Sequence, residues 1–193
     1  MTLSERTLGD WLEHWAETTP DKEYIVYSDR NLRFTWKQFN ERVDDMAKGL
    51  MAIGVEKGTH VGLWAANVPD WLTILYACAK VGAVAVTVNT NYKQSELEYL
   101  CENSDMHTLC IVNGEKDSDF VQMTYTMLPE LRTCQRGHLK SERFPRMKNV
   151  VYIGQEKFRG MYNTPELLLL GKNIANDSLL KAKSQVSCHD VVN

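Results

Sequence analysis

With 193 residues, the chain is long enough for one large domain or two small ones. Hydrophobic residues make up 44% of the sequence and charged residues 24%, the composition of an ordinary water-soluble protein. The net charge of −3 is too close to neutral for bulk electrostatic attraction to nucleic acid or to an anionic membrane.

The amino-terminal residues, MTLSERTLGDWLEHW, carry no apolar segment behind a basic start, so we expect no secretory signal and a cytoplasmic location. The cysteines also favour a cytoplasmic location, because they are odd in number, lack a C-x-x-C pair and do not cluster with histidine. We expect buried free thiols where they lie inside apolar runs, and no metal site. The five are Cys78, Cys101, Cys110, Cys134 and Cys188.

The first predicted elements are a hairpin and a helix. Residues 24–28 and 32–34 read as two strands around the polar turn Asp29-Arg30-Asn31. Thr35 and Gln38 then form a T-x-x-Q capping box, which predicts that a helix starts here, and Phe34 and Phe39 are spaced as a hydrophobic staple. Apolar residues follow at helical spacing as far as Ile53, and Gly54 supplies a left-handed stop.

The next stretch, residues 71–88, is nearly long and apolar enough for a membrane span. Lys80 and Gly82 interrupt it, and its second half is rich in valine. We therefore expect a buried helix over 69–81 and a strand over 83–88 with both faces covered, preceded by a strand over 60–64.

Strand-like and helix-like segments continue to alternate after residue 90. The pattern predicts helices over 93–103, 118–128 and from 164 to Gly171, with more helix to about Ala182, and strands over 107–112 and 149–153. Successive βα units predict an α/β fold, with a mainly parallel, doubly wound sheet flanked by helices and the N-terminal β-hairpin attached.

Residues 132–148 interrupt the alternation with a basic stretch. It contains Arg132, Arg136, Lys140, Arg143, Arg146 and Lys148 against the single acid Glu142. Such a stretch could meet coenzyme A phosphates or a membrane surface. Because we see no apolar face interleaved with the charges, we favour a solvated basic connecting loop.

Recognisable catalytic motifs are absent from the sequence. It contains no G-x-G-x-x-G, G-x-x-x-x-G-K-[ST], G-x-S-x-G or H-E-x-x-H pattern. The scattered histidines (His14, His60, His107, His138 and His189) are interpreted as surface or packing residues. The acid pairs Asp44-Asp45, Glu96 with Glu98, and Asp117 with Asp119 are interpreted as solvated helix faces or helix-dipole partners.

A series of short fragments nevertheless resembles one family. They are Phe34-Thr35 with Phe39, the turn Gly54-Val55-x-Lys57-Gly58-x-x-Val61, Asn67 with Trp71, Ala79 with Gly82-Ala83, and Glu96-Leu97 with Tyr99-Leu100. In this order and spacing they resemble the first part of the adenylate-forming (AMP-binding) superfamily, which includes acyl-CoA synthetases. Val88-Asn89-Thr90-Asn91-Tyr92 resembles fatty-acyl and related acyl-CoA ligases, among them long-chain fatty-acid–CoA ligases, although Thr90 replaces the usual proline.

The resemblance implies a parent enzyme that converts a fatty or other carboxylic acid to an acyl-adenylate and then to an acyl-CoA, with ATP, Mg²⁺ and coenzyme A. The family's phosphate loop follows a sequence like Asp190-Val191, close to the last residue, Asn193. We therefore expect residues 1–193 to be one N-terminal subdomain, truncated before that loop. No catalytic, cofactor-binding or metal-binding residue of the family is carried over to this chain, and we expect it to be inactive alone.

Two alternatives stay open. The parent could be an adenylation domain that loads a carrier protein, or the chain could be a stand-alone α/β interaction module. If it is a ligase piece, its partner is the missing C-terminal part of the same protein, and the bare docking face should promote self-association. No nucleic-acid partner and no transmembrane segment are expected.

Overall fold

The computed structural model describes residues 4–114 and 119–193. Five parallel strands form the main sheet, in the order β4-β3-β5-β6-β7. They are β3 (His60–Trp64), β4 (Val84–Thr87), β5 (Thr108–Ile111), β6 (Asn149–Tyr152) and β7 (Tyr162–Asn163). The order places β4 on one side of β3 and the later strands on the other, so the expected doubly wound parallel sheet is confirmed.

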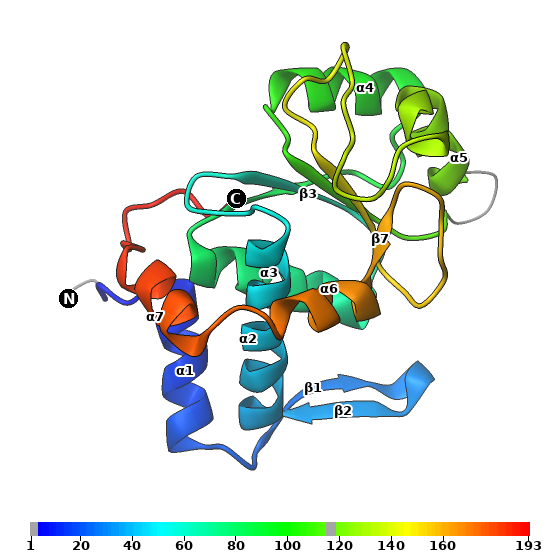
Figure 1. Ribbon diagram of the computed structural model, residues 1–193. Coiled ribbons are helices and arrows are strands. Elements are labelled where there is room, and N and C mark those ends of the chain that lie inside the picture. The colour runs from blue at the N-terminus through cyan, green and yellow to red at the C-terminus, as the bar shows by residue number, and fades with distance from the viewer. Residues whose placement is uncertain (1–3, 115–118) are drawn as a thin grey trace.

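Helices cover both faces of this sheet (Figure 1). One layer consists of α1 (Leu8–Thr18), α2 (Trp36–Ala52), α3 (Pro69–Val81), α6 (Thr164–Gly171) and α7 (Asn176–Ser184), and the other of α4 (Gln94–Asn103) and α5 (Phe120–Met127). Two short 3-10 helices, η1 (Ser28–Arg30) and η2 (Pro129–Arg132), lie in connections. The core between the layers is one apolar cluster that includes Phe39, Leu63, Ile74 and Leu109.

The hairpin and the helix after it form as predicted. β1 (Glu23–Tyr27) and β2 (Leu32–Thr35) pair antiparallel and project from the body (Figure 1). The Thr35 hydroxyl accepts from the Gln38 amide, and the Gln38 side chain accepts from the Thr35 amide. The rings of Phe34 and Phe39 lie 6.3 Å apart, as a staple requires, and Gly54 adopts a φ of 89° after the helix.

Two elements were not predicted, and one expectation is partly wrong. Helix α1 and the two-residue strand β7 have no counterpart in the sequence analysis. Strand β4 is buried only in part, because it is the edge strand: Ala85 is buried but Val86 is half-buried and Thr87 is exposed. The start of the helix predicted over 118–128, and Asp117, lie outside the described residues.

The apolar stretch 71–88 is divided between α3 and β4, as expected, with Gly82 at a φ of 81° between them. Among the described residues, no helix is long and apolar enough to cross a membrane.

Candidate functional site

The carboxyl ends of the parallel strands form one edge of the main sheet, and the strand order reverses there beside β3. Doubly wound sheets bind their ligands in the crevice at such a reversal. The two strands that flank it are β3, which ends at Trp64, and β5, which ends at Ile111 and pairs with it. This edge is therefore the first place where a site is expected.

Trp64 holds an unusual position at this edge. Its side chain is fully buried and stacks on Phe120 at the start of α5, with ring centroids 3.8 Å apart and planes 13° from parallel. Its indole Nε1–H is buried and finds no hydrogen-bond partner among the described residues. A buried donor without an acceptor costs about 1–3 kcal/mol. An acceptor brought to this position would therefore be stabilising.

Farther along the same edge, polar groups converge on Glu156, in the connection after β6. The Tyr152 hydroxyl donates to the Glu156 carboxylate over 2.6 Å, and the Asn113 amide donates to the same oxygen over 3.2 Å. Burial and the Glu156 carboxylate both raise the pKa of Tyr152, so its phenol stays protonated and acts as a donor. These amide, phenol and carboxylate groups can orient a polar ligand by hydrogen bonds.

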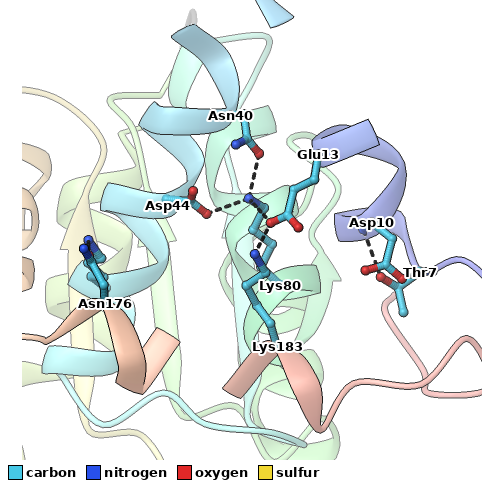
Figure 2. Close-up of polar contacts among 9 residues, drawn as sticks. Thr7, Asp10, Glu13, Asn40, Asp44, Lys80, Asn176 and Lys183 are labelled. Atoms are coloured by element: carbon cyan, nitrogen blue, oxygen red, sulfur yellow. Dashed lines mark hydrogen bonds and ion pairs between the residues drawn. The ribbon is translucent and has the colours of Figure 1, made fainter. Parts of the chain in front are cut away.

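A second polar cluster lies between helices on one side of the sheet, and Figure 2 shows its side chains. Lys80, near the end of α3, is a fully buried lysine whose ammonium donates to Asp44 over 2.5 Å and to Asn40 over 2.7 Å, both on α2. It also pairs with Glu13 of α1 over 2.9 Å. Lys183 of α7 pairs with the same Glu13 oxygen. The cluster thus joins four helices through the charges of two lysines and two acids.

The pKa of Glu13 shows that the charged state of the cluster is the stable one. Burial alone raises the pKa of this carboxyl, but the hydrogen bonds and charges of Lys183 and Lys80 outweigh burial, and the net pKa is lowered. Because every charge has an opposite partner, we interpret the cluster as a set of structural ion pairs that hold the four helices together. The interruption of an apolar stretch by Lys80 could have indicated it, since a buried lysine requires acidic partners.

The basic stretch 132–148 is held in place by contacts with other elements. Arg136 pairs with Glu166, Arg143 with Glu98 and Glu102, and Arg146 with Asp105. The Arg132 guanidinium lies over the Tyr125 ring, 4.4 Å from its centroid. Contrary to the expected lack of an apolar face, the stretch also buries Leu139, Phe144 and Met147. Its arginines therefore attach a connection to the body.

The cysteines behave largely as expected. Cys78, Cys101 and Cys110 are buried, and burial raises the pKa of Cys78 and of Cys101 to about 12, so these thiols stay protonated. Of the acids interpreted as solvated, Asp44 instead contacts Lys80, and Glu98 pairs with Arg143. In residues 4–114 and 119–193, no group of three or more His, Cys, Asp or Glu side chains is placed to hold a metal ion.

The parallel sheet, whose strand order reverses beside β3, defines a doubly wound α/β protein. Residues 12–168 match the sequence model of the family described as "AMP-binding enzyme". The chain therefore belongs to the AMP-binding enzyme family.

Relatives and solved structures agree with this membership. The chain is 39% identical over 191 residues to the Bacillus subtilis protein named "Putative acyl-CoA synthetase YngI", covering 99% of this chain and 35% of the relative. It is 31% identical over 192 residues to the human "Medium-chain acyl-CoA ligase ACSF2, mitochondrial", again covering 99% of this chain and 31% of the relative. The chain spans about a third of the length of the curated relatives it matches.

Among solved structures, a long-chain-fatty-acid-CoA ligase (FadD1) from Archaeoglobus fulgidus superposes with a TM-score of 0.65 at 22% identity, over 89% of this chain and 31% of that one. The N-terminal domain of FACL13 from Mycobacterium tuberculosis superposes with a TM-score of 0.65 at 20% identity, over 90% and 38% of the two chains. At these identities the likeness establishes the fold alone.

Proposed function

We propose that this chain is the N-terminal third of an acyl-CoA ligase. The whole protein would activate a carboxylic acid with ATP to an acyl-adenylate and then transfer the acyl group to coenzyme A. The observation that carries this proposal is the coverage of the named relatives, an acyl-CoA synthetase and a medium-chain acyl-CoA ligase. They match this chain over 99% of its length and continue far beyond it.

The role we assign to this chain is that of a scaffold. Joining a carboxylate to a phosphate brings two anions together, which requires a preorganised cationic site. Of the two lysines and four arginines named at the site, all but Arg132 pair with a carboxylate within the fold, for example Lys80 with Asp44 and Arg136 with Glu166. The Arg132 guanidinium lies over the Tyr125 ring instead. ATP supplies the reactive phosphate, and we assign its binding, with that of Mg²⁺, to the rest of the protein. The carboxyl edge beside Trp64 would face that part.

The whole protein encoded by the gene provides the direct test. Incubation with ATP, coenzyme A and fatty acids of increasing length should release AMP and form acyl-CoA, and the name of the ACSF2 relatives favours medium chains. AMP release only with an amino acid, or acyl transfer only to a phosphopantetheinyl carrier protein, would favour an adenylation domain. ADP in place of AMP would contradict an adenylate mechanism.

The 193-residue chain by itself should show no carboxylate-dependent exchange between ATP and pyrophosphate. The physical reason is that stabilising the charge on the reacting phosphorus needs cationic and amide groups that we place outside this chain. Exchange between ATP and pyrophosphate that co-purifies with the chain during chromatography would show that the chain contains a complete adenylation site. A whole protein without ligase activity would instead favour the stand-alone interaction module.

A further inference from the structure

A hollow of about 550 Å³ lies at the amino ends of the strands, on the opposite edge from Trp64. Three lining residues come from the starts of three adjacent strands: His60 begins β3, His107 precedes β5 and Lys148 precedes β6. The His107 amide donates to the His60 carbonyl over 3.0 Å, and the Lys148 amide donates to the His107 carbonyl over 2.8 Å. Backbone pairing therefore places these three residues side by side at the amino edge of the sheet.

Lys148 differs from the arginines of the basic stretch in its partners. Its ammonium donates to the Pro145 carbonyl over 2.7 Å, and no carboxylate of the described residues pairs with it. An ammonium has three donors, so two stay available to a ligand or to water. Lys148 therefore lies beside the hollow as a cation that no carboxylate of the described residues contacts.

The remaining charges around the hollow nearly cancel. Arg146 pairs with Asp105 over 3.1 Å, and Lys57 pairs with Asp190 over 2.7 Å. Lys148 and Glu56 are then left with opposite charges. The net charge of the hollow is then close to zero, and a proton bound by His107 makes it positive.

The two imidazoles are placed to become donors toward a ligand. His60 Nδ1 contacts the Ser104 carbonyl, which can only accept, so Nδ1 carries a hydrogen and Nε2 is left to face a ligand. Burial and then the charge of Lys148 lower the pKa of His107, while Glu56 acts in the opposite direction. A bound anion would offset the Lys148 charge and favour protonation of His107.

We propose that this hollow binds a small phosphate-bearing anion, held by Lys148 together with the imidazoles of His60 and His107. The peripheral oxygens of a phosphate suit donors that arrive from three neighbouring strands, and the negative charge of the anion favours protonation of His107. The site is separate from the carboxyl edge and does not depend on the proposed ligase function.

Titration of the 193-residue chain with inorganic phosphate, followed by NMR of the histidine rings, tests the proposal. Phosphate should shift the His60 and His107 signals saturably and raise the pH at which His107 titrates. Acetate at the same ionic strength should produce neither effect. Shifts that do not saturate, or equal shifts with acetate, would overturn the proposal.

Two variants locate the binding. Lys148→Gln removes the uncompensated charge and should weaken phosphate binding about tenfold, the loss of one charge-assisted contact. Lys140→Gln removes an exposed charge of the same basic stretch that does not line the hollow, and should bind as wild type does. Equal weakening in both variants would mean that phosphate responds only to overall charge. The NMR signals of the histidine rings in the wild-type chain test phosphate binding even if a variant fails to fold.

Discussion

Glu13 is the residue on which two lysines from different helices converge, Lys80 from α3 and Lys183 from α7. Hydrogen bonds to a charged group contribute more than neutral ones, about 1.5–3 kcal/mol each when well buried. The Glu13 side chain is 25% exposed and Lys80 is fully buried, so the carboxylate is screened only in part. Losing it would leave Lys80 with Asp44 and Asn40 and leave Lys183 without its acid.

Glu13→Gln should therefore lower the free energy of unfolding at pH 7 by about 1–2 kcal/mol. Because the folded-state pKa of Glu13 lies below its unfolded value of about 4.3, its contribution is complete above that pH. It is lost as the pH falls through the folded-state pKa, so the difference between wild type and variant should shrink in strong acid.

Urea unfolding at pH 7, 5 and 3 measures both effects. Glu17→Gln, an exposed change one turn farther along α1, serves as the control and should alter stability by less than about 0.5 kcal/mol. A difference between wild type and Glu13→Gln that stays constant down to pH 3 would contradict the assigned role.

At the scale of elements, α2 and α6 approach each other backbone to backbone at two glycines. A Cβ added to Gly49 would lie 2.8 Å from the Leu167 carbonyl oxygen, and one added to Gly171 would lie 2.7 Å from the Gly49 amide nitrogen. Both neighbours are backbone atoms, so they can move aside only if a whole helix moves. These two glycines set the distance at which α6 packs.

Gly49→Ala should destabilise the protein by about 1–3 kcal/mol, the usual cost of overpacking. At an exposed helical position the same change would stabilise by about 1 kcal/mol through helix propensity, so the sign of the effect reports the backbone contact. Thermal or urea unfolding measures it, with Glu41→Ala on the exposed face of α2 as the control. A Gly49→Ala variant more stable than wild type would show that the helices have room to separate.

Elements with a local signal could be predicted from the sequence, and those that depend on tertiary contacts could not. The capping box at Thr35 and the stop at Gly54 locate α2 closely. Helix α1 has a similar box, in which the Thr7 hydroxyl accepts from the Asp10 amide, but Asp10 stands where the usual sequence signature has Glu or Gln. Strand β7 has only two residues, Tyr162 and Asn163, and is defined by its pairing with β6.

The candidate site was less predictable for the same reason. The unpaired indole of Trp64 and the row formed by His60, His107 and Lys148 arise from strand order, which brings distant residues together. No spacing in the sequence marks them. Asp44 was interpreted as solvated because its partner Lys80 follows 36 residues later, on a different helix.

At the scale of the whole molecule, several large apolar side chains lie on the surface. Leu169 of α6 is 63% exposed and Leu180 of α7 is 57% exposed, and both helices belong to the layer that also contains α1. Trp11 and Trp15 of α1 are exposed by 37% and 40%. Single exposed apolar residues are common in folded proteins, but several on one helical layer favour association.

We therefore expect the 193-residue chain to self-associate at high concentration and to bind a hydrophobic dye. Replacing Leu169 and Leu180 together by serine should reduce both, with little change in stability because neither side chain is buried. Light scattering across a concentration series measures the association. Lys181→Ser, an exposed change beside Leu180, should leave it unaltered. A wild-type chain that stays monomeric and binds no dye would show that the exposed apolar side chains of this layer need no partner.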